Sequence, residues 1–396
     1  VIFLLNINLF NQLILIFIFI FEICLLIYFF KKNLSKISII KIPSIILNSL
    51  NFLNTILVVI FLYLAIKSFG KIIYPGDPYV MWNSWAIDIF ENKLPIKNLD
   101  YPIGYPALQA ISYKMIGTYK IEFFAQAIQI IYPLFSLLVL IRIITITNNN
   151  LFSFVLLFFS LLILNQFRHT LYIGFVDTIL VFCSTLLIYL IELIRNNKKL
   201  FYENNFLIIL GIILCAPGLI KQTGLYISFI SPLILFLFLD LKFKINHIKN
   251  ILILYLIITF IVSPWYLYKI FYIINDFGSA NAVNLISLHE EKTFIEKIHR
   301  TSKLIFGLGI YLIIPMFLIS LSKKDSRKFL AFIILPYYFI WSFLYGNDAR
   351  NFALILPFVA FVLAESVFVI DNHIIKKIDK SLKSFLPIII IISLLL

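Results

Sequence analysis

Residues 76–106 read GDPYVMWNSWAIDIFENKLPIKNLDYPIGYP, a polar stretch rich in acids, tryptophans and prolines in a mostly apolar chain. Asp77, followed by Pro78, opens an amphipathic run. At helical spacing, one face carries the apolar side chains Met81, Trp85 and Ile89. The polar side chains face elsewhere: Asn83, Asp88 and Glu91. This pattern predicts a short helix on a membrane surface, with its tryptophans at headgroup level. After a second break, a further short amphipathic run is expected over Ala107–Ile116.

The overall composition predicts the fold class. Hydrophobic residues make up 62% of the 396 residues and charged residues only 13%. Because no soluble domain of this size can bury so much apolar surface, we expect an all-α polytopic membrane protein. The net charge of +14 would suit a nucleic-acid partner, but the basic residues lie in short loops between apolar runs, so none is predicted. The three cysteines, also within apolar runs, are interpreted as packing residues: Cys24, Cys183 and Cys215.

About twelve apolar runs approach the length that spans a bilayer. They lie at Leu13–Phe30, Ile45–Ile66, Phe123–Ile146, Leu151–Leu164, Val176–Ile194, Phe206–Ile220, Leu225–Leu239, Ile251–Ile274, Leu304–Leu321, Phe329–Leu344, Phe352–Ile370 and Phe385–Leu396. Leu151–Leu164 and the two runs that flank Lys221 are short, so one of them is expected to be broken or re-entrant. We expect one transmembrane domain over residues 1–396. Because the chain begins at Val1 and stops inside an apolar run, a fragment at both ends is expected.

The placement of Lys and Arg predicts the orientation in the membrane. One set of alternating short loops holds 19 of the 33 basic residues and only six acidic ones. Short loops rich in Lys and Arg face the cytoplasm. The other set then faces outward in a plasma membrane, including a first large loop at residues 67–121, which carries the short surface helices, and a second at residues 275–302.

Asp77 allows two interpretations that are compatible. An Asp followed by Pro is a favoured helix start, because Asp caps free amides and Pro fits the first helical turn. A carboxylate held at the outer membrane face is also able to take a proton from a hydroxyl group. Asp100, before Tyr101 and Pro102, has the same ambiguity between a turn and a functional group.

Three outward helix ends carry cations close to Gly or Pro: Arg168 with His169, Lys221, and Arg350. A charge at a helix end is usually a loop charge or a side chain that extends to the interface. These cations nevertheless oppose the inward bias of Lys and Arg, and a phosphate group near the outer leaflet would account for them.

With these features in order, the chain resembles the GT-C superfamily of membrane glycosyltransferases from about Ile45 to Ile370. That family carries an acidic motif in its first outward loop, here Gly76-Asp77-Pro78. A subgroup adds Trp-Asn and Asp-Tyr-Pro, as Trp82-Asn83 and Asp100-Tyr101-Pro102 do. Further similarity lies at Gly174–Asp177, Lys221–Gly224 and Arg350. Pro78 replaces the second acid of the usual motif, so a metal ligand at that position is not indicated.

The resemblance implies an inverting transfer of a sugar from a polyprenyl-phosphate donor to an acceptor hydroxyl of a glycan, lipid or protein. Asp77 would be the catalytic base, and Lys221 and Arg350 would hold the donor phosphate. The acceptor or the sugar would contact Trp82, Asn83, Asp100 and Tyr101. For the tryptophans, anchoring at the membrane surface is the alternative. No cofactor is expected; a divalent metal ion is compatible with the sequence but is not indicated by it.

Two other classes stay open. An O-antigen polymerase or ligase also handles polyprenyl-linked sugars at the outer face, but such enzymes tend to carry their large loop late in the chain. A polytopic transporter would ordinarily show repeats and ionisable residues near the bilayer midplane. Only Glu22 and Glu365 lie deep within apolar runs here.

The orientation can be tested by cysteine labelling in intact cells. The variant Asn98→Cys should react with a membrane-impermeant thiol reagent, and the variant Asn197→Cys should not. The distribution of Lys and Arg predicts that these two loops lie on opposite sides of the membrane. The chain without an added cysteine is the control. The reverse labelling pattern would overturn the orientation and the site assignment with it.

Overall fold

The structure is a computed structural model that describes residues 49–66, 82–95, 102–166, 176–239, 245–275, 296, 318, 320–344 and 349–373. Within these ranges it contains helices and turns and no β-strand. The helices are α3 Ser49–Ile66, α4 Ser84–Phe90, α5 Gly104–Ile116, α6 Phe123–Thr147, α7 Asn150–Gln166, α9 Asp177–Asn196, η3 Lys198–Tyr202, α10 Asn204–Ile220, α11 Gly224–Phe238, α12 Ile245–Asn275, α16 Lys324–Phe329, η4 Leu330–Ile334, α17 Leu335–Leu344, α18 Ala349–Phe352 and α19 Leu356–His373. The all-α prediction is confirmed for these residues.

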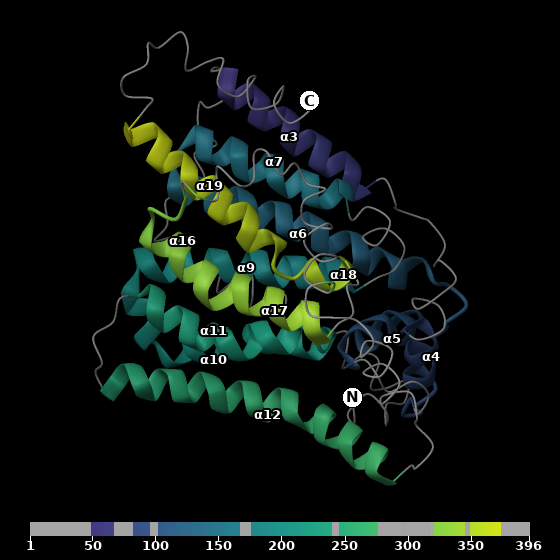
Figure 1. Ribbon diagram of the computed structural model, residues 1–396. Helices are drawn as coiled ribbons and strands as arrows, with labels where there is room; N and C mark the ends of the chain where they lie inside the picture. The colour runs from purple at the N-terminus through teal and green to yellow at the C-terminus, as the bar shows by residue number, and fades with distance from the viewer. Residues whose placement is uncertain are drawn as a thin grey trace.

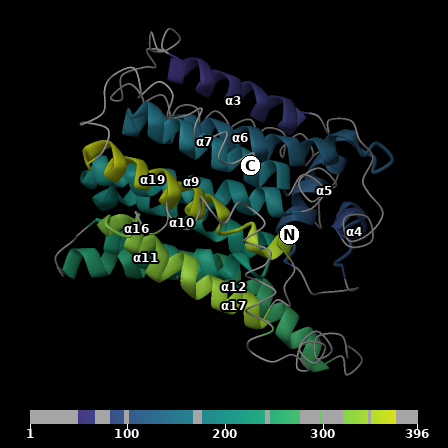
Figure 2. The same ribbon diagram turned by 45° about the horizontal axis from the view of Figure 1, so that its top comes forward.

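The long helices lie side by side in a bundle (Figures 1 and 2). Helix α6 packs on α9, α10 packs on α11 and α12, and α7 packs on α3 and α19. The short helices α4 and α5 pack on each other at one end, whereas α16 lies at the opposite end (Figure 1). The bundle therefore has two chemically distinct ends joined by apolar helices.

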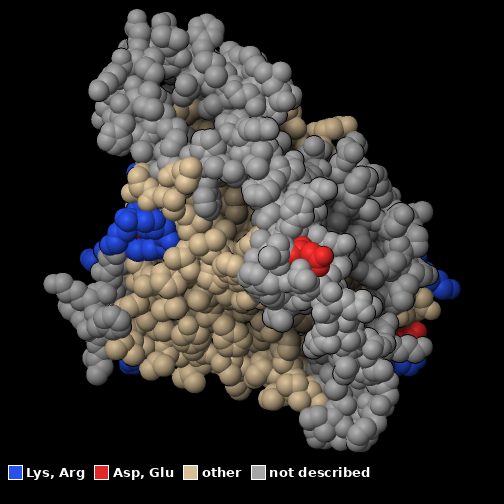
Figure 3. Space-filling view, viewed as in Figure 1, with Lys and Arg blue, Asp and Glu red and all other residues tan. Residues whose placement is uncertain are grey.

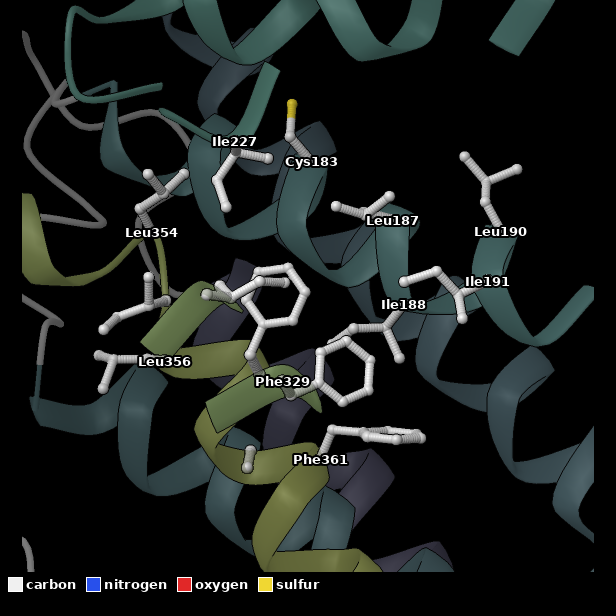
Figure 4. Packing of buried hydrophobic residues seen from close by; sticks show 14 of the residues in the cluster. Cys183, Leu187, Ile188, Leu190, Ile191, Ile227, Phe329, Leu354, Leu356 and Phe361 are labelled. Carbon is white, nitrogen blue, oxygen red and sulfur yellow. The ribbon is translucent and has the colours of Figure 1, made fainter. Parts of the chain in front are cut away.

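The interior is built from aliphatic and aromatic side chains contributed by helices far apart in sequence. Phe329 of α16 packs against Phe361 of α19 with ring centroids 5.5 Å apart, and both lie near Leu187 and Ile188 of α9 (Figure 4). Large apolar side chains are also exposed on the outside, such as Phe260 of α12, which is 82% exposed. Apolar residues on both faces are what a bundle solvated by lipid requires.

Among the residues that the structure describes, three helices are long and apolar enough to cross a membrane: Phe123–Thr147, Asp177–Asn196 and His247–Tyr268. Five more are apolar but shorter. This agrees with a helical membrane protein, while a total of twelve spans is not established. The predicted runs at Leu13–Phe30 and Phe385–Leu396 lie outside the described residues, and so do most of Leu304–Leu321 and of the loop at residues 275–302.

One predicted run is not a single helix. Residues 349–352 form α18, a turn follows over residues 353–355, and α19 starts at Leu356. Pro357 explains this break, because it lacks an N–H group and its ring clashes with the carbonyl four residues earlier unless it lies in the first helical turn. The prediction of one helix over Phe352–Ile370 was therefore wrong at its first turn.

The two short runs that flank Lys221 form a tight helical hairpin, α10 and α11, rather than a broken helix. The Lys221 N–H donates to the Pro217 carbonyl at 3.1 Å, and the Gly224 N–H donates to the Lys221 carbonyl at 2.9 Å. A Cβ atom at Gly224 would lie 2.0 Å from the Pro217 oxygen, so this turn requires glycine. Tyr266 of α12 reinforces the turn through a 2.9 Å hydrogen bond to the Gly218 carbonyl.

Charged groups connect the helices at the α16 end, where Figure 3 shows Lys and Arg gathering. Arg195 bonds Glu192 at 2.6 Å within α9 and Asp325 of α16 at 2.8 Å. Lys328 donates a hydrogen bond to the Leu237 carbonyl at 2.7 Å. Leu237 lies in the last turn of α11, where the carbonyl groups have no partner within the helix, so this bond satisfies one of them. By the charge rule this end would face the cytoplasm.

The hairpin makes a prediction about stability. Gly224→Ala should lower the unfolding free energy by about 1–3 kcal/mol, because the new methyl group collides with backbone rather than with a flexible side chain. Thermal unfolding in detergent measures the change. Gln222→Ala, in the same turn but partly exposed, is the control and should change little; an equally stable Gly224→Ala protein would contradict the geometry.

Candidate functional site

The α4–α5 end contains the predicted site residues that the structure describes. Trp82, Asn83 and Lys221 lie within the described ranges, whereas Asp77, Asp100 and Tyr101 lie outside them. Arg350 belongs to α18, but its side chain is not described. The roles predicted for Asp77, Asp100, Tyr101 and Arg350 therefore stay predictions.

Helix α4 confirms the expected amphipathic pattern but not its expected surroundings. Trp85 and Ile89 are buried together, as one apolar face predicts. They pack within the protein, however, and the Trp85 ring lies 6.5 Å from that of Trp265 on α12. Trp82 and Trp85 are each only 1% exposed and pack against protein, so neither ring contacts lipid headgroups directly; their depth in the membrane stays a prediction.

Asn83 is buried rather than turned outward, and hydrogen bonds explain why. Its Oδ1 accepts from the Tyr113 hydroxyl of α5 at 2.5 Å, and its Nδ2 donates to Glu122 Oε1 at 3.3 Å. Gln126 of α6 donates to the other Glu122 oxygen at 3.4 Å. Burial, with the Glu122 charge adding to it, raises the pKa of Tyr113, so the phenol stays a donor. Asn83 thus ties α4 to α5 and to the start of α6.

The α4–α5 pair docks onto the end of α10. A Cβ atom at Gly104, the first residue of α5, would lie 2.5 Å from the Leu219 carbonyl oxygen, so the two backbones are in direct contact. Beside this contact Trp82 and Tyr105 form an edge-to-face pair with centroids 6.0 Å apart. Both rings belong to the same buried cluster as Val176 and Ile220, the residues just before Asp177 and Lys221.

At this junction the structure places a buried ion pair. The Lys221 Nζ atom donates to Asp177 Oδ1 at 2.9 Å, with the side chains 6% and 0% exposed. Asp177 is the first residue of α9, one residue after the start of the predicted run, and its carboxylate makes no capping hydrogen bond. Because an unpaired buried charge is costly, each group requires the other. Lys221, predicted to meet a phosphate, already has a carboxylate partner.

Three buried oxygen atoms beside this pair lack a hydrogen-bond partner: Asp177 Oδ2, Thr178 Oγ1 and Thr223 Oγ1. Asp177, Thr178 and Thr223 are each at most 2% exposed. Unsatisfied buried polar groups are rare and often mark places where a ligand or water binds. Thr178 follows Asp177 directly and Thr223 lies two residues after Lys221, so we treat these four residues together and call them the junction cluster: Asp177, Thr178, Lys221 and Thr223.

Sequence reasoning missed the pairing of Asp177 with Lys221, although a signal existed. Asp177 begins one apolar run and Lys221 ends the next, so antiparallel neighbours bring the two opposite charges to the same end. It also missed Tyr113 and Glu122, since only the fold shows that α5 turns its Tyr113 hydroxyl towards Asn83. In the described part of the chain no three His, Cys, Asp or Glu side chains group as metal ligands would.

Comparison with family models, with curated proteins and with solved structures finds no match to this chain.

The ion pair makes a prediction about stability. Asp177→Asn or Lys221→Met should each lower the unfolding free energy by about 3–5 kcal/mol, because each leaves one buried charge uncompensated. The double variant Asp177→Asn with Lys221→Met removes both charges and should recover a large part of that loss. Thermal unfolding of the three variants in detergent tests this. Losses that simply add would contradict the pairing.

Proposed function

We propose that this chain is an inverting glycosyltransferase that moves a sugar from a polyprenyl-phosphate donor to an acceptor hydroxyl at the extracytoplasmic face of a membrane. The observation that carries the proposal is the uneven distribution of polar groups. One end of an apolar helical bundle carries two short amphipathic helices, a buried polar network around Asn83 and the junction cluster. This end belongs to the loops that the charge rule directs outward.

A lipid-linked donor suits such an architecture. Its polyprenyl tail is as apolar as the exposed faces of α3, α6 and α12, while its phosphate and sugar need polar groups at the membrane interface. Of the two cations predicted to hold the phosphate, Lys221 has its charge offset by Asp177 at 2.9 Å. Arg350, in α18, is therefore the better candidate for the phosphate, and its planar guanidinium suits phosphate oxygens.

The transfer step needs a base for the acceptor hydroxyl. In an inverting reaction the acceptor oxygen attacks the anomeric carbon, the bond to the phosphate oxygen breaks, and the hydroxyl proton passes to the base. Asp77 is the proposed base, because it occupies the position of the acidic motif in the first outward loop. Asn83 contributes differently, because both of its polar groups bind within the protein and hold α4 in place.

A transporter remains the second class to test. Transporters place ionisable residues near the bilayer midplane, whereas Asp177 and Lys221 lie at helix ends. The observed location supports chemistry at the interface better than passage through the bundle.

The decisive variant is Asp77→Asn. Asn is as good a helix cap as Asp, so stability should change by no more than about 1 kcal/mol. It cannot accept the proton, and loss of a general base should slow sugar transfer by about 100- to 10,000-fold. The measurement is transfer from polyprenyl-phosphate sugars by purified protein, beside a melting curve.

Two further variants separate the roles. Asp77→Ala should lose both the cap and the base, and Asp100→Asn is the control for a neighbouring turn acid. Near wild-type transfer by a folded Asp77→Asn protein would show that Asp77 only caps a helix. A wild-type protein that transfers no sugar from any donor, but moves one across a vesicle membrane, would favour the transporter.

A further inference from the structure

The junction cluster has nearly zero net charge, because the Asp177 carboxylate lies 2.9 Å from the Lys221 ammonium and both are buried. A phosphate that approaches Lys221 meets the Asp177 carboxylate at almost the same distance. The attraction of the ammonium is then largely cancelled by repulsion from the carboxylate. The pair is therefore poorly suited to an anion.

The same pair is well suited to a neutral group that both donates and accepts hydrogen bonds. Asp177 Oδ2 is an acceptor without a donor, and the Thr178 and Thr223 hydroxyls have neither a donor nor an acceptor partner. A sugar hydroxyl can donate to a carboxylate oxygen and accept from a threonine hydroxyl. The hydrogen bonds that these residues leave unmade are those that an alcohol makes, and a sugar carries several alcohol groups on one ring.

We propose that the junction cluster of Asp177, Thr178, Lys221 and Thr223 recognises hydroxyl groups of the sugar carried by the lipid-linked donor. This inference rests on the proposed function and changes one part of it: Lys221 acts on the sugar and not on the phosphate. Lys221 holds the carboxylate in place, and the free carboxylate oxygen with the two threonine hydroxyls contacts the sugar.

The cluster lies where the donor's sugar would need to be, at the boundary between the apolar bundle and the α4–α5 pair. Gly104 of α5 touches the Leu219 backbone, two residues before Lys221. Asp177 is fully buried in this state. A sugar therefore reaches Asp177 only when the packing around the starts of α9 and α11 opens.

The sharpest variants are Thr178→Val and Thr223→Val. Valine has nearly the shape of threonine, and the hydroxyl it removes has no partner within the protein. The fold should therefore be as stable as wild type or more so. Each lost hydrogen bond to the sugar should weaken donor binding about 3- to 10-fold.

Thr185→Val is the matched control. Thr185 is buried on the same helix two turns further on, but its hydroxyl donates to the Val181 carbonyl at 2.8 Å. Its loss should leave ligand binding unchanged.

The experiment compares two probes in detergent: polyprenyl phosphate alone, and polyprenyl phosphate that carries mannose or glucose. The two valine variants should bind polyprenyl phosphate as wild type does and bind the sugar-bearing probes more weakly. Asp177→Asn, if folded, should lose the preference for sugar-bearing probes altogether. Equal weakening for both kinds of probe would make the cluster a phosphate site and overturn the inference.

Two more outcomes separate this inference from the proposed function. A wild-type protein that prefers sugar-bearing probes, with valine variants that keep this preference in full, refutes the role of the cluster and leaves the glycosyltransferase intact. A wild-type protein that binds neither kind of probe refutes the proposed function and the inference together.

Discussion

The architecture of the α4–α5 end depends on one interaction, the buried ion pair of Asp177 with Lys221. Either charge would be strongly destabilising if it were buried without the other. Moving the start of α9 away from the end of α10 would leave both unpaired, so the ion pair holds these two helix ends together. The tight turn that needs Gly224 then directs α11 back along the bundle, and Tyr266 fixes α12 to the same turn. With these helix ends in register, the Leu219 backbone offers the surface on which α5 docks through Gly104.

The two ends of the bundle use charge in different ways. At the α16 end, Arg195 pairs with Asp325 across α9 and α16 and Lys328 bonds α11, with side chains that are 34%, 21% and 12% exposed. At the α4–α5 end the polar groups are buried and are bound to one another or left without a partner. Buried polar groups that a fold does not satisfy reduce stability, so each of them needs an explanation, such as a bound ligand or water; Ser326 of α16 is one more at the opposite end.

Much of the fold was predictable from the sequence, because apolar runs in lipid have few alternatives to helices. The starts or ends of α6, α9, α10 and α11 fall within two residues of the predicted runs. What covers the apolar face of α4 was not predictable. The amphipathic pattern shows that Trp85 avoids water, but it does not distinguish contact with lipid from the observed contact with Trp265 of α12. The partner of Lys221 was missed because the charge rule considers the positions of Lys and Arg alone. It takes no account of an acidic residue, such as Asp177, at the end of a neighbouring helix. The break before α19 was marked by Pro357.

The most direct test of the central claim is an experimental structure of the wild-type protein in lipid nanodiscs with a polyprenyl-phosphate sugar bound. The account predicts that the sugar lies at the end of the bundle formed by α4, α5 and the α10–α11 turn. A sugar hydroxyl should be within hydrogen-bond distance of Asp177 Oδ2, the Asp177–Lys221 contact should be intact, and the phosphate should lie away from it. A donor bound at the α16 end, or a phosphate bound directly to Lys221 in place of Asp177, would contradict the account.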